Sequence, residues 1–340
     1  MTKALALLLL CSVASAHAGQ DTSGYSVEAR FPIRGTMTWD YITVDAFAHR
    51  LYVAHGTQVE VLNSDTGASI GVVSGTPGVH GIALAQSLGR GFTSNGGDDS
   101  VTIFDLKTLQ QVGRVKVGSR PDRIFYDERS RRVFTCNHGS GDVSVIDARS
   151  GSVIAVLPIG GGGEQNVPAP GNRIYLAVAD TSEVIRFDPL TLRITARFAL
   201  GKGKEPHGLA FDEAHHRLFV ACRNKLIVVL GSADGHVITT LGIGDTVDMA
   251  AFDPKTQNIF ASNGDGSMSA FHEVSADRYK DLGRVETGPG AKQMDFNAQT
   301  GKLFLPTGTI LESGLGANGK PNRSVREGSF AVLEVGSASR

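Results

Sequence analysis

Four histidines stand beside short apolar runs in segments that a repeating fold could bring together. His80 and His207 precede the runs GIALA and GLAFD, whereas His55 and His138 follow the runs LYVA and VFTCN. A neutral imidazole is a ligand for transition metals and can also act as a general base. We therefore predict His80 and His207 as metal ligands and a divalent metal ion as the cofactor they would hold, although their spacing matches no short metal motif.

Carboxylates, basic side chains and the single tryptophan occupy the same kind of segment as these histidines. The set predicted to share one ligand-binding face is Trp39, Asp40, His55, His80, Asp122, Arg123, His138, Glu164, His207, Asp248 and Lys292. Arg223 and Gln293 lie in loops of the same type. Opposite charges such as Lys292 and Asp248 would clamp a carboxylate or phosphate, or form a structural ion pair. The indole of Trp39 would stack on a planar ligand or pack in the core.

A strand signal that recurs along the chain predicts the elements that position these residues. It reads LYVAH at 51–55, GFTSN at 91–95, VFTCN at 133–137, IYLAV at 174–178, LFVAC at 218–222, IFASN at 259–263 and LFLPT at 303–307. Successive copies start 40 to 44 residues apart, which is the period of β-propeller blades. Each copy follows an inner strand and precedes an alternating strand and an outer strand. The sequence thus predicts an all-β, seven-bladed propeller whose loops gather the polar set at the mouth of its axis.

The two ends of the repeat region predict how the ring closes. The last unit ends with its third strand, FAVLEV at 330–335, and has no outer strand, whereas SVEARFPIR at 26–34 resembles an outer strand without a blade. We expect this N-terminal strand to complete the last blade, because pairing removes an open sheet edge on both. Residues 19–340 are accordingly predicted to be one propeller domain.

Four of the repeat cores also resemble a known family. The quartets YVAH at 52–55, FTSN at 92–95, FTCN at 134–137 and FASN at 260–263 are similar to those of the YVTN-repeat propellers of the YncE-like group. The resemblance covers the mature chain and implies a bacterial, often periplasmic, seven-bladed propeller. It brings no catalytic motif that could be carried over to this sequence.

The N-terminus and the composition indicate the compartment and exclude some partners. Residues 1–18, with Lys3, an apolar run at 4–10 and small residues to Ala18, read as a secretory signal peptide, so we expect a periplasmic or secreted protein. No later apolar run is long enough for a membrane span. Without Lys3, 32 of the 33 basic residues remain against 34 acidic ones, interleaved along the chain, so no nucleic-acid partner is expected. Cys136 and Cys222 are predicted to be packed thiols, and the protein a monomer.

The loop at 307–329 is much longer than its counterparts in the other repeats. It is rich in Gly and Asn, and two alternatives are open: a lid over the mouth or a surface excursion. Its glycines at 314, 316 and 319 fit G-x-G-x-x-G, but no helix follows, so no dinucleotide site is predicted.

Three functions remain compatible with these features. The first is a non-enzymatic binding propeller that presents its polar mouth to a small molecule, a metal ion or a protein. The second is a lactonase-like or lyase-like enzyme that uses His80 or His207, a metal and a carboxylate such as Glu164. The third is a protein-interaction scaffold. The sequence contains no H-E-x-x-H, C-x-x-C or Walker motif, which favours binding over catalysis.

Overall fold

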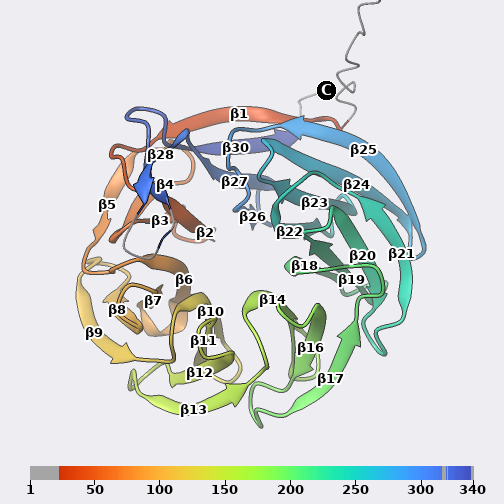
Figure 1. Ribbon diagram of the computed structural model, residues 1–340, viewed down its shortest axis with the longest axis horizontal. Coiled ribbons are helices and arrows are strands. Elements are labelled where there is room, and N and C mark those ends of the chain that lie inside the picture. Colours follow the sequence, from red (N-terminus) through yellow and green to blue (C-terminus); the bar gives the residue numbers. More distant parts are fainter. Residues whose placement is uncertain (1–22, 316–318, 320, 338–340) are drawn as a thin grey trace, which may run out of the picture.

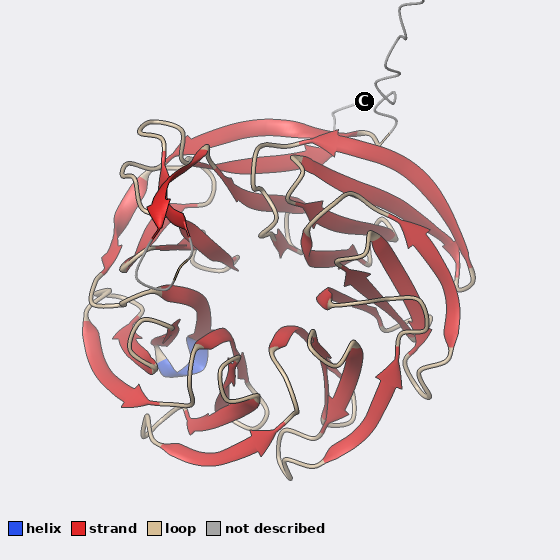
Figure 2. Ribbon diagram, in the orientation of Figure 1, coloured by secondary structure: helices blue, strands red, loops and turns tan. Residues whose placement is uncertain are grey.

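Seven four-stranded antiparallel sheets are arranged around one axis, and an additional two-stranded sheet extends from the ring (Figure 1). The structure is a computed structural model that describes residues 23–315, 319 and 321–337. Almost all of the ring is strand, turn or loop, and the one helical segment among these described residues is the short 3-10 helix η1 (Gln86–Leu88) (Figure 2). The predicted seven-bladed propeller is confirmed, whereas the predicted signal peptide lies outside the described residues.

Each blade runs from an inner strand near the axis to an outer strand at the rim. Blade 1 contains β2 (Trp39–Asp45), β3 (Arg50–His55), β4 (Gln58–Asn63) and β5 (Ser69–Val73). Blade 2 contains β6 (Val79–Ala85), β7 (Arg90–Asn95), β8 (Ser100–Asp105) and β9 (Gln111–Lys116). Blade 3 contains β10 (Pro121–Asp127), β11 (Arg132–Asn137), β12 (Asp142–Asp147) and β13 (Val153–Pro158). Blade 4 contains β14 (Gly163–Ala169), β15 (Arg173–Val178), β16 (Glu183–Phe187) and β17 (Ile194–Ala199).

The remaining blades follow the same order until the last. Blade 5 contains β18 (Pro206–Asp212), β19 (Arg217–Cys222), β20 (Leu226–Gly231) and β21 (Val237–Gly242). Blade 6 contains β22 (Val247–Asp253), β23 (Asn258–Asn263), β24 (Ser267–Ser275) and β25 (Arg278–Glu286). Blade 7 contains β26 (Asp295–Asn297), β27 (Lys302–Thr307), β30 (Ala331–Ser337) and, as its outer strand, β1 (Tyr25–Pro32).

The N-terminal strand closes the ring as the sequence predicted. β1 is antiparallel to β30, with Phe31 opposite Val332 and Pro32 opposite Ala331. Ile33 continues the contact by donating its backbone N–H to the Phe330 carbonyl at 3.0 Å. Strands from the two ends of the chain therefore share one sheet, and neither the first nor the last blade keeps an open edge.

In each blade, the second strand carries a buried aromatic residue at the same register position, and these residues anchor the blades. These residues are Tyr52, Phe92, Phe134, Tyr175, Phe219, Phe260 and Phe304, and each is at most 2% exposed. Phe134, for example, stacks on Phe125 of its own blade, with ring centroids 5.1 Å apart, and contacts Phe187 of blade 4 at 5.6 Å. The apolar face of each strand is thus buried between neighbouring blades, which holds the ring together.

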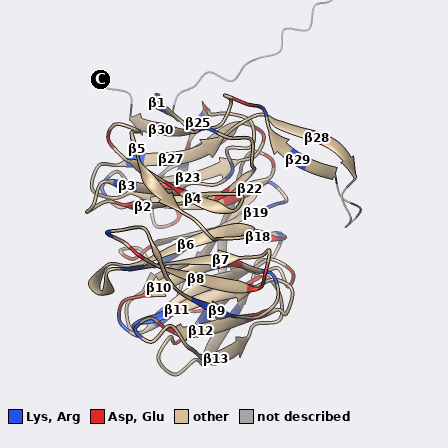
Figure 3. Cartoon of the chain, turned by 90° about the vertical axis from the view of Figure 1, so that its left-hand side faces the viewer, with Lys and Arg blue, Asp and Glu red and all other residues tan. Residues whose placement is uncertain are grey.

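The long loop of blade 7 is a β-hairpin. Strands β28 (Ile310–Leu315) and β29 (Pro321–Val325) pair with each other and project from the body of the ring (Figure 3). The base of the hairpin is fixed, because the Val325 N–H donates to Thr36 O at 2.7 Å and the Val325 side chain is buried. In the view down the axis, β28 lies over blade 1 and leaves the centre of the ring uncovered (Figure 1).

Both cysteines outside the predicted signal peptide are free and buried, as predicted. Burial raises the pKa of the Cys222 thiol to about 12. Within the described part of the chain, no helix has the length and apolar character needed to cross a membrane.

Candidate functional site

The register of the inner strands places one ionisable side chain from each blade at the mouth. In every blade, one inner-strand residue pairs with the buried aromatic of the second strand. The residue three positions before it is always charged or a histidine. These mouth residues are Asp40, His80, Asp122, Glu164, His207, Asp248 and Lys292. All seven were predicted for this face, and all except His80 line one cavity of about 200 Å³ together with Tyr41, His138, Arg223 and Gln293.

On one side of the mouth, His80 lies between two carboxylates. Its Nδ1 atom is 2.5 Å from Asp40 Oδ2 and 3.9 Å from Asp122 Oδ1. Burial of the ring acts to lower its pKa, but the hydrogen bond to Asp40 and the charge of Asp122 outweigh this and raise the pKa of His80 to about 9. The imidazole is therefore cationic at neutral pH and compensates part of the acidic charge.

Next to this group, two imidazoles flank the carboxylate of Glu164. His138 Nε2 and His207 Nε2 each lie 3.3 Å from the same atom, Glu164 Oε1, and the Tyr41 hydroxyl donates to Oε2 at 3.4 Å. Glu164 is 6% exposed. Burial, reinforced by the charges of Asp122 and Asp248, raises the pKa of Glu164 well above its usual range. The carboxyl groups on this side of the mouth are thus not fully compensated by positive charges.

A basic group occupies the other side of the mouth. Lys292 Nζ is 2.6 Å from Asp248 Oδ2, and Arg223 pairs with the other oxygen of the same carboxylate. Gln293 donates through Nε2 to Asp40 Oδ1 at 2.9 Å and to Asp248 Oδ2 at 3.1 Å. These bonds fix the orientation of the amide, because only its NH₂ group can donate to a carboxylate. The Gln293 Oε1 atom is buried without a hydrogen-bond partner.

Three other predicted residues lie away from this cavity. The Trp39 ring stacks on Phe330 with centroids 5.2 Å apart, so it packs in the core. His55 is fully buried inside blade 1, where its Nδ1 is 3.2 Å from Glu60 Oε1. Arg123 lies deeper along the axis, with its guanidinium 5.4 Å from the centre of the Tyr41 ring.

His55 takes the place of an asparagine that has a structural role in other repeats. Asn95 donates from Nδ2 to Ser100 Oγ and Thr102 Oγ1, on the next strand of its own blade, at 3.0 and 2.9 Å. The last residue of each quartet thus points into the blade, while the next residue, such as His138, can reach the mouth. Alignment of the quartets already places His55 at the last, inward-pointing position and His138 one residue after it. Tyr41 was missed because it follows Asp40 directly, and alternation along a strand predicts that adjacent residues face apart.

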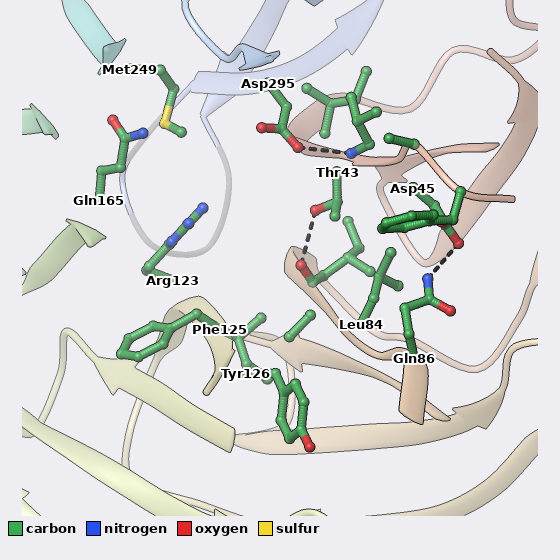
Figure 4. A pocket seen from close by; sticks show the side chains of 17 residues that line it. Thr43, Asp45, Leu84, Gln86, Arg123, Phe125, Tyr126, Gln165, Met249 and Asp295 are labelled. Atoms are coloured by element: carbon green, nitrogen blue, oxygen red, sulfur yellow. Dashed lines mark hydrogen bonds between the residues drawn. The ribbon is translucent and has the colours of Figure 1, made fainter. Parts of the chain in front are cut away.

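A set of side chains in the middle of the axis separates the mouth from the opposite end. Gln165, Arg123, Met249 and Asp295 approach one another there (Figure 4). The Asp295 carboxylate accepts the Val44 N–H at 2.7 Å, which ties blade 7 to blade 1. Below this layer the inner strands carry an apolar ring formed by Val44, Leu84, Tyr126, Pro168, Phe211, Phe252 and Phe296. The axis is therefore densely charged at one end and mostly apolar at the other, where the larger cavity measures about 1000 Å³.

The fold and the mouth define a seven-bladed propeller with a small, charged cavity on its axis. The chain belongs to the cytochrome D1 heme domain family, whose family model matches residues 49–251. YVTN-type propellers, which the quartets resemble, are related to this family. No curated protein sequence matches the chain.

Three solved structures show the same fold with low sequence identity. Hydrazine synthase of Kuenenia stuttgartiensis is 13% identical over 94% of this chain and 100% of its own, with a TM-score of 0.70. The WD40 repeats of RRP9 are 10% identical over 92% of this chain and 98% of theirs, with a TM-score of 0.73. The structure of U3-55K is 10% identical over 91% of this chain and 99% of its own, also with a TM-score of 0.73. These likenesses establish the fold.

The residues at neither end of the axis fit the haem that the family's description implies. A haem needs an apolar cavity together with an axial ligand such as His, Cys, Met or Tyr. The mouth has histidines, but its cavity of about 200 Å³ is walled by ion pairs that a macrocycle would have to break. The opposite cavity is large and mostly apolar, although Asp212, Glu213 and Asp295 also line it; no histidine, cysteine or tyrosine lines it, and its one methionine, Met294, is 2% exposed. We therefore derive no chemistry through a haem.

Proposed function

We propose that this protein binds a divalent transition-metal ion at the propeller mouth through His138, Glu164 and His207. The proposal rests on one observation: two imidazole nitrogens, from the blades on either side of blade 4, face a single carboxylate oxygen, each at 3.3 Å. Imidazole and carboxylate together suit zinc, nickel, copper and iron. Of the two predicted ligands, His207 belongs to this set, and His80 stays a prediction through the neighbouring Asp40, His80 and Asp122 group, whose ligand atoms lie within 4.8 Å of one another.

The hydrogen bonding of His207 supports a cation at this point. Its Nδ1 atom lies 3.0 Å from the Glu205 carbonyl oxygen, which can only accept, so Nδ1 carries a proton. In the neutral ring Nε2 then presents a lone pair towards Glu164 Oε1. A lone pair and a carboxylate oxygen in contact repel unless a cation lies between them or the carboxyl group, whose raised pKa favours its protonated form, donates to the ring. A histidine whose other nitrogen donates to a backbone carbonyl is the usual arrangement of a metal ligand.

His138 supplies the second lone pair. Its Nε2 is buried and has no hydrogen-bond partner, although it lies 3.3 Å from Glu164 Oε1. The ring reaches this position because residue 162 is glycine, where an added Cβ would lie 2.7 Å from His138 Nδ1. In a tetrahedral site with bonds of about 2.0–2.1 Å, neighbouring ligand atoms are about 3.3 Å apart. The observed separations from Glu164 Oε1 match that spacing, but the two imidazole nitrogens lie more than 4.8 Å from each other, so the rings would have to move towards one another to complete the site.

The basic side of the mouth indicates which class of small molecule a bound metal would hold. Lys292 and Arg223 share the single carboxylate of Asp248, which leaves one positive charge in excess. A cavity of about 200 Å³ admits only a small molecule. We infer a binding protein for a small oxyanion, such as a carboxylate or phosphate, held between the metal and these two cations.

Metal content measured on matched variants tests the proposal. Protein stripped with EDTA and dialysed against Zn²⁺ should retain one equivalent fewer after His138→Ala, His207→Ala or Glu164→Gln than the unaltered chain retains. His236→Ala is the control, because His236 Nδ1 forms a similar 2.6 Å contact with Asp234 on the exposed surface. Equal zinc content in all variants would exclude a metal at the mouth, whereas a loss confined to His80→Ala would move the ion to the Asp40, His80 and Asp122 group.

Export is part of the proposed function and rests on the N-terminal sequence pattern. Expression in a bacterium and fractionation should yield a periplasmic protein whose first residue follows Ala16 or Ala18. An unprocessed chain confined to the cytoplasm would contradict export without affecting the metal site.

A further inference from the structure

A second group of ionisable side chains lies at the junction of blades 5 and 6, away from the mouth. Asp212 ends β18, His215 follows in the turn, and Glu273 comes from β24 of the next blade. His215 Nδ1 is 2.8 Å from Asp212 Oδ2 and 3.5 Å from Glu273 Oε1. One ligand atom of each residue lies within 4.8 Å of the others. None of these contacts involves the residues of the mouth.

The propeller fold does not require a carboxylate at position 273. In four other blades the equivalent backbone N–H, at the end of the third strand, also donates to the turn before the second strand. Those positions hold Ser64, Leu106, Ala148 and Ser232. All four are small or apolar residues, as suits a buried position. Glu273 is the charged exception, so its carboxylate calls for a separate explanation.

Glu273 is buried with few partners. The residue is 2% exposed, and its Oε2 atom has no hydrogen-bond partner. The Tyr279 hydroxyl lies 3.4 Å from Oε1, but its single proton also has the Ala276 carbonyl at 2.7 Å, the shorter contact. Among the described residues, the one ion-pair partner of Glu273 is His215. A carboxylate removed from water without a fixed counter-charge is costly, so a cation is expected beside it.

We propose that Asp212, His215 and Glu273 bind a second divalent transition-metal ion that links blade 5 to blade 6. One imidazole and two carboxylates form a ligand set suited to zinc or manganese. The Asp212 carboxylate is already oriented, since it accepts the backbone N–H groups of Ala214 and His215 at 3.0 and 3.1 Å. The His215 side chain is 37% exposed, which gives the ion access from solvent. The Glu273 Oε2 atom, which has no hydrogen-bond partner, is available as a further ligand atom for the metal.

The alternative occupant of this cluster is a proton shared by the two carboxyl groups. Glu273→Gln separates the two cases, because the amide keeps the volume of the side chain, cannot bind the ion as a carboxylate and needs no compensating cation. His215→Ala is the second variant, because it removes a ligand whose side chain is partly exposed, and so folding should be retained.

The experiment is carried out on the full chain with His207→Ala as background, so that its outcome does not depend on the mouth site. EDTA-treated protein is titrated with ZnCl₂ while bound zinc and Tm are measured. We expect one bound equivalent and a higher Tm in the background variant, and loss of both when Glu273→Gln or His215→Ala is added. His236→Ala should change neither. If Glu273→Gln leaves zinc content unchanged, or raises Tm in EDTA while zinc has no effect on the background variant, the proton is the occupant and the proposal fails.

Discussion

The side-chain amide of Gln165 forms two hydrogen bonds with the backbone of Ala250, a residue two blades away. Its Nε2 donates to the Ala250 carbonyl at 2.9 Å, and its Oε1 accepts the Ala250 N–H at 2.9 Å and the Leu209 N–H at 2.8 Å. The inner edge of each blade has no neighbouring strand. The side-chain amide takes the place of a peptide group there and bonds the backbone of two inner strands. It joins blades 4, 5 and 6 across the axis.

This arrangement predicts a large effect for one substitution. Gln165→Ala should leave two inner-strand N–H groups without acceptors and lower the free energy of unfolding by about 1–3 kcal/mol. Urea unfolding measures the change. Gln110→Ala, at an exposed position, is the control and should be close to neutral. Equal effects of the two substitutions would show that the axial bonds do not contribute.

A second prediction concerns the closest approach of two inner strands. A Cβ added at Gly208 would lie 2.7 Å from the backbone N of Ala250 and 2.7 Å from the carbonyl carbon of Met249, neither of which can move independently of its strand. Gly208→Ala should therefore destabilise the fold by about 1–3 kcal/mol. Gly242→Ala is the matched control, because a Cβ there meets nothing within 4 Å. A Tm for Gly208→Ala equal to that of the control would contradict this packing argument.

The pKa of His80 predicts a pH dependence of stability in EDTA. Burial and the charge of Arg120 act to lower the pKa of this ring, but Asp40 and Asp122 outweigh them and raise the folded-state pKa to about 9, above the model-compound value of 6.5. Protonation of His80 therefore stabilises the fold fully below about pH 6.5, and this contribution is lost as the pH rises to 9. The unaltered chain should lose more stability over that interval than His80→Gln does, as measured by denaturant unfolding. Parallel curves for the two proteins would exclude this role.

The closure of the ring gives the fourth prediction. Deletion of residues 25–34 removes β1 and exposes the edge of β30, so Tm should fall by many degrees and the protein should tend to aggregate. A chain that starts at residue 23 retains the strand and serves as the control. Unchanged thermal stability after the deletion would contradict the closure.

The sequence alone determined the number of blades, the closing strand and the loops that reach the mouth. A period of 40 to 44 residues repeated seven times leaves one way to bury every strand, because each blade covers its neighbour. Register is fixed by the same alternation of buried and exposed residues. For that reason the mouth residues, including Glu164, His207 and Lys292, were predictable from position alone.

Only the tertiary structure decided which of these residues touch. His55 and His138 come from the same kind of loop, yet one side chain points into a blade and the other to the axis, because a shift of one residue along a strand reverses the direction of the side chain. The contacts of Glu164 with two imidazoles and of Glu273 with His215 cross between blades. Such contacts depend on how the sheets twist and pack around the axis, and no local pattern in the chain specifies that geometry.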